Sequence, residues 1–168
     1  MRLFAAINFD RNMNDALLSV QEQFRENNVK GNYTRAENLH LTLAFIGEYN
    51  DPDYVLDTLS AMHFSPFVIT LDGIGSFDRL WWAGLSGTDE LVRCAKQIRH
   101  LLSDAGIPFD RKKFSPHITL LRNASEPVIP DVTIPKATFK VNEISLMRSD
   151  RGKQGMKYSV LGIIKADI

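Results

Sequence analysis

Apolar and polar positions follow one another along the chain in patterns that predict a strand and then a helix. Residues 3–9 form a nearly continuous apolar run, which is typical of a buried strand. After it, apolar residues recur at steps of four, three and four positions, the spacing that keeps them on one face of a helix. These residues are Met13, Leu17, Val20 and Phe24, and they predict a helix over residues 11–28.

The same steps return in the second half of the chain. There the apolar positions are Leu91, Ala95, Ile98 and Leu102. Thr88 precedes them and is followed by two acidic residues, which predicts an N-cap and a first turn that suits the helix dipole. Gly106 fits the C-terminal end, because glycine readily adopts the left-handed conformation that ends many helices. A second long helix is therefore expected between Thr88 and Gly106.

Shorter runs predict the remaining elements. Asp51 followed by Pro52 is typical of a helix start, with the aspartate as N-cap and the proline at the first helical position. Alternating apolar runs predict the strands. These span residues 39–46, 67–77, 80–85, 115–121, 136–147 and 156–164, and residues 148–155 are expected to be a loop.

One four-residue phrase occurs twice. It reads His40-Leu41-Thr42-Leu43 in the first half and His117-Ile118-Thr119-Leu120 in the second, 77 positions later. Alternate side chains of a strand share a face, so each phrase points a histidine and a threonine one way and buries its apolar residues the other way. Helix, polar connection and His-x-Thr strand come in the same order in both halves, which indicates an internal duplication.

The duplication predicts an α+β fold with two pseudo-symmetric lobes. Each lobe is expected to be a small, mostly antiparallel sheet with helices on its outer face, and each contributes one His-x-Thr strand to a central cleft. The length of 168 residues fits a single two-lobed domain over residues 1–168.

Composition and charge limit the kinds of function and the cellular compartment that fit this chain. Twenty basic and twenty acidic residues cancel, so no global field favours nucleic-acid binding and any basic patch must be local. Cys94 is the single cysteine, which excludes an intrachain disulfide, favours a reducing compartment and indicates inert packing within its helix. No apolar run approaches the roughly 20 residues of a membrane span, and the first residues turn polar too early for a signal peptide. A cytoplasmic, soluble protein is expected.

Two histidines and two threonines facing one cleft can perform acid–base chemistry on a small anionic group. An imidazole titrates near neutrality, so a neutral and a protonated histidine can act together as base and acid at pH 7. Threonine hydroxyls suit the non-bridging oxygens of a phosphate. A metal site is disfavoured, because zinc needs three or four ligands and neither phrase holds a cysteine or carboxylate. One such histidine alone would indicate a hydrogen-bonded core residue; the repetition favours a catalytic pair.

These phrases resemble the two signature strands of the two-histidine (2H) phosphoesterase superfamily, and in particular its RNA 2′,3′-cyclic phosphodiesterase branch, also called 2′-5′ RNA ligase. The resemblance rests on residues 40–45 and 115–122, and on residues 2–7 as an opening strand. It implies a two-lobed α+β fold with a central cleft and no metal or organic cofactor. It also implies hydrolysis of an RNA 2′,3′-cyclic phosphate to a 2′-phosphate, and reversible 2′-5′ joining of RNA ends.

Carried onto this chain, the resemblance implies a role for each site residue. His40 is the proton donor to the departing 3′ oxygen, and His117 is the proton acceptor from the attacking water. Thr42 and Thr119 hold the phosphate oxygens, and Arg122 is a phosphate contact. The regular alternation of a strand argues against this role for Arg122, because it places the residue on the face opposite to the histidine and threonine. A twist, a bulge or the end of the strand would bring Arg122 back to their face. The implied partner is RNA with a 2′,3′-cyclic phosphate end, such as tRNA halves or oligonucleotides, and we expect a monomer.

Other residues leave alternatives open. Trp81 and Trp82 are expected to give one core and one exposed ring, with base stacking as the alternative. Core packing is favoured over base stacking for Phe9 and Phe45, and His63 and His100 lack a threonine partner, so surface or packing roles are expected. Basic residues in two segments fit either solvated connections or a rim that steers phosphate. They are Arg111, Lys112 and Lys113, and Arg148, Arg151 and Lys153.

Two rival functions remain beside the cyclic phosphodiesterase. One is a phosphodiesterase acting on 2′-5′ oligonucleotides or small cyclic phosphates. The other is a module that binds RNA ends without turnover, against which the intact His-Thr pairs argue.

Overall fold

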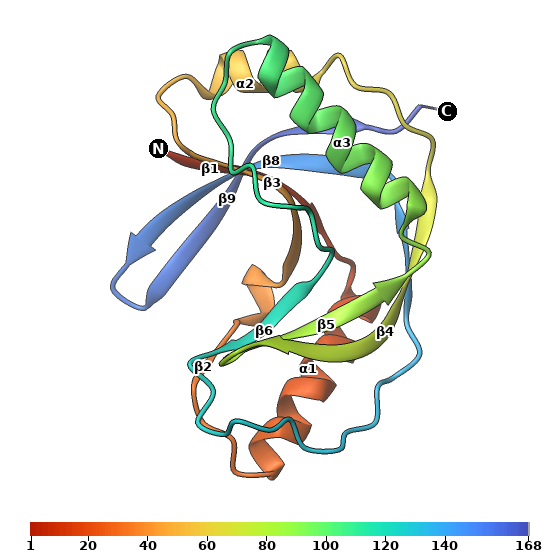
Figure 1. The fold of residues 1–168 in the computed structure, drawn as a ribbon, viewed down its shortest axis with the longest axis vertical. Helices are drawn as coiled ribbons and strands as arrows, with labels where there is room; N and C mark the ends of the chain where they lie inside the picture. The colour runs from red at the N-terminus through yellow and green to blue at the C-terminus, as the bar shows by residue number, and fades with distance from the viewer. Residues whose placement is uncertain (168) are drawn as a thin grey trace.

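Two antiparallel sheets divide the chain into an upper and a lower half in the view of Figure 1. The computed structural model describes residues 1–167. The upper sheet has four strands in the order β3-β1-β8-β9, and the lower sheet has five in the order β2-β6-β5-β4-β7. The predicted α+β class is confirmed. The strands are β1 Arg2–Asn8, β2 Asn32–Tyr33, β3 His40–Glu48, β4 Phe67–Phe77, β5 Leu80–Ser86, β6 Ile118–Arg122, β7 Thr138–Val141, β8 Glu143–Gly152 and β9 Gly155–Lys165.

Three α-helices cover the outer faces of the sheets, and the long ones cross between the halves. α1 (Arg11–Glu26) follows β1 of the upper sheet but packs on the lower sheet, where the Phe24 and Trp81 ring centroids are 5.0 Å apart. α3 (Asp89–Asp104) follows β5 of the lower sheet but packs on β3 of the upper one, beside α2 (Pro52–Leu59). A short 3₁₀ turn, η1 (Ala36–Asn38), precedes β3. The apolar stripe determines which helix face is buried, whereas the connections decide which sheet it covers.

Of the two predicted N-caps, Asp51 caps its helix in the structure and Thr88 does not. Asp51 accepts a hydrogen bond from the backbone N–H of Tyr54 at 3.0 Å, which confirms it as the N-cap of α2. Thr88 is at the N-cap position of α3, but its side chain makes no capping bond. Its ψ of 1° departs from the extended backbone that usually aims a capping side chain at the first turn.

The C-terminal strands differ most from the sequence prediction. The run expected over residues 136–147 is two strands, because β7 pairs with β4 of the lower sheet and β8 pairs with β1 of the upper sheet. The expected loop over residues 148–155 is wrong. Most of it extends β8 and β9 into a hairpin whose ladder runs to the pair Gly152 and Gly155. The second histidine strand also begins later than predicted, at Ile118.

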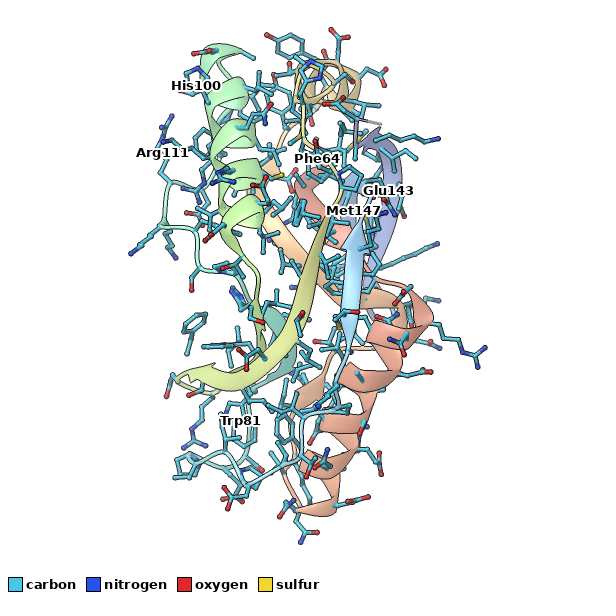
Figure 2. All side chains as sticks on the ribbon, turned by 90° about the vertical axis from the view of Figure 1, so that its right-hand side faces the viewer. Phe64, Trp81, His100, Arg111, Glu143 and Met147 are labelled. Atoms are coloured by element: carbon cyan, nitrogen blue, oxygen red, sulfur yellow. The ribbon has the colours of Figure 1, made fainter. Side chains whose placement is uncertain are left out.

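The core joins side chains from both halves of the molecule. Figure 2 shows Trp81 in the lower half of the view and Phe64 in the upper half, the halves that hold α1 and α3 respectively. Trp81 is fully buried, as expected for one ring of its pair, and Phe64 packs edge-on against Phe67. Cys94 is buried, and burial raises the pKa of its thiol to about 11, which agrees with an inert role.

Candidate active site

A cavity of about 460 Å³ lies between the two sheets and collects the residues singled out in the sequence. Strands β1, β3, β8 and β9 contribute from the upper sheet, and β6 contributes from the lower one. The five predicted site residues that line it are His40, Thr42, His117, Thr119 and Arg122. The other lining residues are Arg2, Phe4, Phe45, Ser149, Arg151, Met156 and Tyr158.

A β-bulge in β3 sets the direction of the side chains that follow the first phrase. The register with β1 shifts between Thr42 and Ala44, which leaves Leu43 as an extra residue. Leu43 and Ala44 are both buried. The next residue, Phe45, therefore returns to the face of His40 and lines the cavity.

The second phrase ends in the same irregularity. The register of β6 with β5 shifts between Thr119 and Leu121, so that Leu120 is the extra residue. Leu120 and Leu121 are both buried, and Arg122 turns back to the cavity that His117 lines. The bulge removes the objection from strict alternation. It also makes Phe45 and Arg122 equivalent positions of the duplication.

Hydrogen bonds orient His40 on both sides of its ring. Its Nδ1 is 2.6 Å from the carbonyl oxygen of Asn38, and its Nε2 is 3.0 Å from Oγ1 of Thr42. A carbonyl oxygen only accepts, so Nδ1 carries a proton and the neutral ring accepts at Nε2 from the threonine hydroxyl. The rings of Phe4 and Tyr158 enclose the imidazole, each with its centroid 5.1 Å from that of His40.

This environment favours the neutral form of His40. Burial lowers its pKa, and the nearby positive charges of Arg122 and a protonated His117 lower it further. The bond to the carbonyl of Asn38 opposes them in part. A phosphate anion between the two histidines would act in the opposite direction, because a negative charge stabilises the imidazolium.

His117 has the same backbone anchor in a more open setting. Its Nδ1 is 2.7 Å from the carbonyl oxygen of Ser115, which again leaves Nε2 for the cavity. This bond is solvent-exposed, whereas both bonds of His40 are partly buried. Phe77 and Trp82 flank the ring, with centroids 5.2 Å and 6.3 Å from it. His117 is therefore the histidine that water reaches more easily.

The cavity is positively charged although the whole chain is neutral. Its lining includes Arg2, Arg122 and Arg151 but no aspartate or glutamate. Within residues 1–167, none of these arginines is within 4.0 Å of an acidic partner. In the same range, no three His, Cys, Asp or Glu side chains are grouped so as to hold a metal ion. The lining suits an anionic group gripped by hydroxyls and guanidinium groups.

The histidines outside the phrases lie on the surface, as expected. His63 approaches Asp167 at 3.3 Å and His100 approaches Asp104 at 3.2 Å, with side chains 77% and 76% exposed. Figure 2 shows His100 on the outer side of α3. Phe9 packs edge-on against Phe139, in agreement with core packing.

Of the remaining basic and aromatic candidates, Phe45 lines the cavity, whereas Arg111, Lys112 and Lys113 do not. Phe45 lines it and lies under the guanidinium of Arg2, 5.4 Å from the ring centroid, so core packing does not describe it fully. Arg111 covers the ring of Phe109 instead of facing the cavity. Lys112 and Lys113 line a neighbouring cavity that His117 and Phe77 also border.

Several cavity residues are not predicted as site residues by the sequence, although the resemblance includes Arg2 in its opening strand. Arg2, Ser149, Met156 and Tyr158 belong to no repeated phrase. Two of the cross-strand pairs in the hairpin bring such residues to the cavity, namely Ser149 with Tyr158 and Arg151 with Met156. The alternation of residues 156–158 could have shown that two of them share a face, but not which face meets the histidines.

In the part of the chain that the structure describes, no helix is both long and apolar enough to cross a membrane.

The chain is similar to several proteins named RNA 2′,3′-cyclic phosphodiesterase. An RNA 2′,3′-cyclic phosphodiesterase of Escherichia coli (strain K12) is 35% identical over 140 residues, which cover 78% of this chain and 77% of that protein. A protein of the same name from Thermotoga maritima is 29% identical over 175 residues, covering 96% and 93%.

Solved structures extend the likeness over nearly the whole fold. A crystal structure of E. coli LigT in its apo form superposes with a TM-score of 0.84 at 29% identity, covering 98% of this chain and 96% of that one. A crystal structure of TT0787 of Thermus thermophilus gives 0.79 at 29% identity, covering 98% and 97%. The model of the 2′-5′ RNA ligase superfamily matches residues 15–153, which include both phrases. The chain belongs to this superfamily of two-histidine phosphoesterases.

Proposed function

We propose that this protein hydrolyses RNA 2′,3′-cyclic phosphate ends to 2′-phosphates without a metal, using the two histidines as acid and base. The observation that carries the proposal is the matched anchoring of both imidazoles. Each Nδ1 is held by a backbone carbonyl two residues earlier in the chain, from Asn38 for His40 and from Ser115 for His117. Each ring therefore presents Nε2, which accepts a proton when neutral and donates one when protonated.

The two environments support different roles for the two histidines. His117, the more open one, takes a proton from water as the water oxygen attacks phosphorus. His40 gives a proton to O3′ as the P–O3′ bond breaks, which leaves a 3′-hydroxyl and a 2′-phosphate. The bound anion supports protonation of His40, and the enclosure that lowers its pKa makes the protonated ring a stronger acid.

The hydroxyls and the guanidinium stabilise the charge that develops on the phosphate. Thr42 and Thr119 donate to non-bridging oxygens, and Arg122 adds charge-assisted hydrogen bonds from the same side as the histidines. In the free protein the hydroxyl of Thr42 donates to His40. Once His40 is protonated its Nε2 no longer accepts, so this hydroxyl becomes available to the phosphate.

The same residues can also join two RNA ends by attack of a hydroxyl group on the cyclic phosphate. If the 5′-hydroxyl of a second RNA replaces water, the acid–base pair forms a 2′-5′ linkage. The proposed partners are RNA ends such as tRNA halves and oligonucleotides, and a similar protein, E. coli LigT, has been solved with 3′-AMP. We also propose that the protein works as a monomer and that its location is the cytoplasm.

A metal-free assay tests the proposal. In EDTA, an oligonucleotide with a 2′,3′-cyclic phosphate end is expected to yield a 2′-phosphate, identified by mapping the product against 2′- and 3′-phosphate standards. A 2′-5′-linked oligonucleotide is assayed beside it, and faster cleavage of that substrate would favour the rival phosphodiesterase. Tight binding of the cyclic end without any turnover would favour the binding module. A 3′-phosphate product would contradict the assigned leaving oxygen.

A further inference from the structure

A second cavity, of about 500 Å³, adjoins the catalytic one at the end of the β8–β9 hairpin. Met156 and Tyr158 line both cavities, so the two share a wall on β9. The far side of the second cavity is formed by η1 and the residue before it. A chain that leaves the catalytic cavity past Tyr158 enters this groove directly.

The hairpin end that forms the groove has no support from the rest of its sheet. Strand β1 pairs with β8 only as far as Ser149, whereas β8 and β9 remain paired for three further residue pairs, up to Gly152 and Gly155. Figure 1 shows the resulting two-stranded ribbon extending away from the sheet on the left of the view. A two-stranded ribbon by itself adds little stability, so its polar and basic end is not explained by folding.

The groove and the catalytic cavity together concentrate positive charge. The second cavity adds Arg35, Lys153 and Lys157 to the three arginines of the first, and its one acidic residue is Glu37, 3.7 Å from Arg35. Within residues 1–167, neither lysine lies within 4.0 Å of an acidic group. Six basic residues line this path in a chain with no net charge.

A buried asparagine connects the groove to the catalytic histidine. Asn38 lines the groove, and its side-chain Nδ2 donates to the carbonyl oxygen of Met156 on β9 at 2.9 Å. Its own carbonyl oxygen holds Nδ1 of His40 at 2.6 Å. The hairpin is therefore fixed at this point against the segment that orients His40.

We infer that this groove binds the RNA strand on the 5′ side of the cyclic phosphate, through its phosphodiester groups. The inference rests on the proposed function and adds a binding site for the RNA chain that carries the cyclic phosphate. Lysines without acidic partners match successive phosphates, whose binding releases counterions and needs no base recognition. A further cavity borders His117 but not His40, and it also holds basic side chains, those of Arg99, Lys112 and Lys113. It includes the carboxylate of Asp110 and three phenylalanine rings, and this acidic and aromatic lining suits a phosphate chain less well.

The experiment compares two substrates in one assay. A 2′,3′-cyclic mononucleotide reports the catalytic cavity alone, and a short oligoribonucleotide with the same cyclic end adds the upstream strand. The test variant is Lys153→Gln combined with Lys157→Gln. The control is Lys136→Gln with Lys165→Gln, which removes the same charge at positions that line neither cavity.

The wild-type protein is expected to prefer the oligonucleotide in kcat/KM. The test variant should lose about two- to thirtyfold on the oligonucleotide, since exposed ion pairs are individually weak, and should keep its rate on the mononucleotide. The slope of log kcat/KM against log salt should become shallower by about 0.7 for each phosphate that the variant no longer neutralises. The control variant should behave as the wild type on both substrates.

Other outcomes overturn the inference. An oligonucleotide rate that equals the mononucleotide rate in the wild type, or that the lysine variant leaves unchanged, shows that no upstream strand is bound there. A defect confined to joining a second RNA by its 5′-hydroxyl shows that the groove holds the other strand. If neither substrate turns over, the proposed function fails. Fluorescence anisotropy of the labelled oligonucleotide then decides about the groove, because equal affinity of wild type and lysine variant would still refute it.

Discussion

The two motif strands carry the same phrase, yet they build chemically different halves of one site. His40 is enclosed by Phe4 and Tyr158 and bonded to Thr42, and its pKa is lowered. His117 has a solvent-exposed anchor and lies beside Phe77. A repeated phrase therefore supplies two equal imidazoles, and the surroundings make one of them better suited to donate a proton and the other to meet water.

The two strands also differ in the side chain that follows the β-bulge. Phe45 and Arg122 occupy equivalent positions and both turn to the cavity, but one brings an aromatic face and the other a positive charge. The charge of Arg122 also acts on the histidine of the opposite strand, since it contributes to the lowered pKa of His40. The halves of the duplication thus act on each other instead of working as two independent copies.

Replacing either motif histidine should have the largest effect. His40→Ala and His117→Ala should each reduce kcat/KM by about 10²- to 10⁴-fold, the usual contribution of general acid–base catalysis. Each variant should keep the wild-type melting profile. Near-full turnover in either variant would remove that histidine from the chemistry.

A change of leaving group separates the two roles. A cyclic substrate with sulfur in place of O3′ releases a thiolate, which needs little protonation. His40→Ala should then regain most of its lost rate, whereas His117→Ala should not, because water still has to be deprotonated. Recovery in the His117 variant instead would exchange the two assignments.

Removing the positive charge of Arg122, which acts on the histidine of the other motif strand, should have the next largest effect. Arg122→Gln should lose about 10²- to 10³-fold in kcat, as expected for one donor to a developing negative charge. Without this cation the pKa of His40 should rise, because a nearby positive charge opposes protonation. An NMR titration of the His40 ring measures that shift to higher pH.

Arg122→Lys is the matched control for this prediction. It keeps the charge but loses the fork of the guanidinium, so the titration of His40 should stay close to that of the wild type while part of the rate is lost. An unchanged titration in Arg122→Gln would mean that the two strands are not electrostatically linked.

The threonines should show a smaller, unequal effect. Thr42→Val and Thr119→Val keep the branched shape and remove a hydroxyl, which costs about 1.5–3 kcal/mol for a donor to a charged group, or on the order of 10–150-fold in rate. Thr42→Val should also change the NMR titration of His40, because of the two threonines it is Thr42 that bonds to that ring in the free protein. Full activity with a lowered melting temperature in both variants would mean that the hydroxyls serve the strands alone.

The histidines outside the cleft should show the smallest effect. His63→Asn and His100→Asn alter exposed side chains at the protein surface. The kcat/KM of each variant and its pH profile should match those of the wild type. A shift in the pH profile of either would show that the profile is not a property of the motif pair, and would weaken every assignment based on it.

Local patterns determined much of this protein from the sequence by itself. The apolar steps predicted α1 and α3, and the doubled phrase predicted both histidine strands and their shared cleft, because side-chain direction within a strand or helix depends only on its period. The same reasoning named His40, Thr42, His117 and Thr119 from their spacing, and the resemblance added Arg122. It also placed Cys94 in the core, where the structure finds it.

Only the tertiary structure decided the features that depend on pairing between distant segments. The bulges that turn Phe45 and Arg122 to the cavity arise from register with β1 and β5, which no local pattern records. Residues 148–155 read as a loop because they are polar and contain glycine, yet backbone pairing across the hairpin makes most of them strand. The lowered pKa of His40 likewise comes from burial and from positive charges outside its own strand. The sequence does not reveal this shift, because burial and the distances between charges exist only once the sheets have come together.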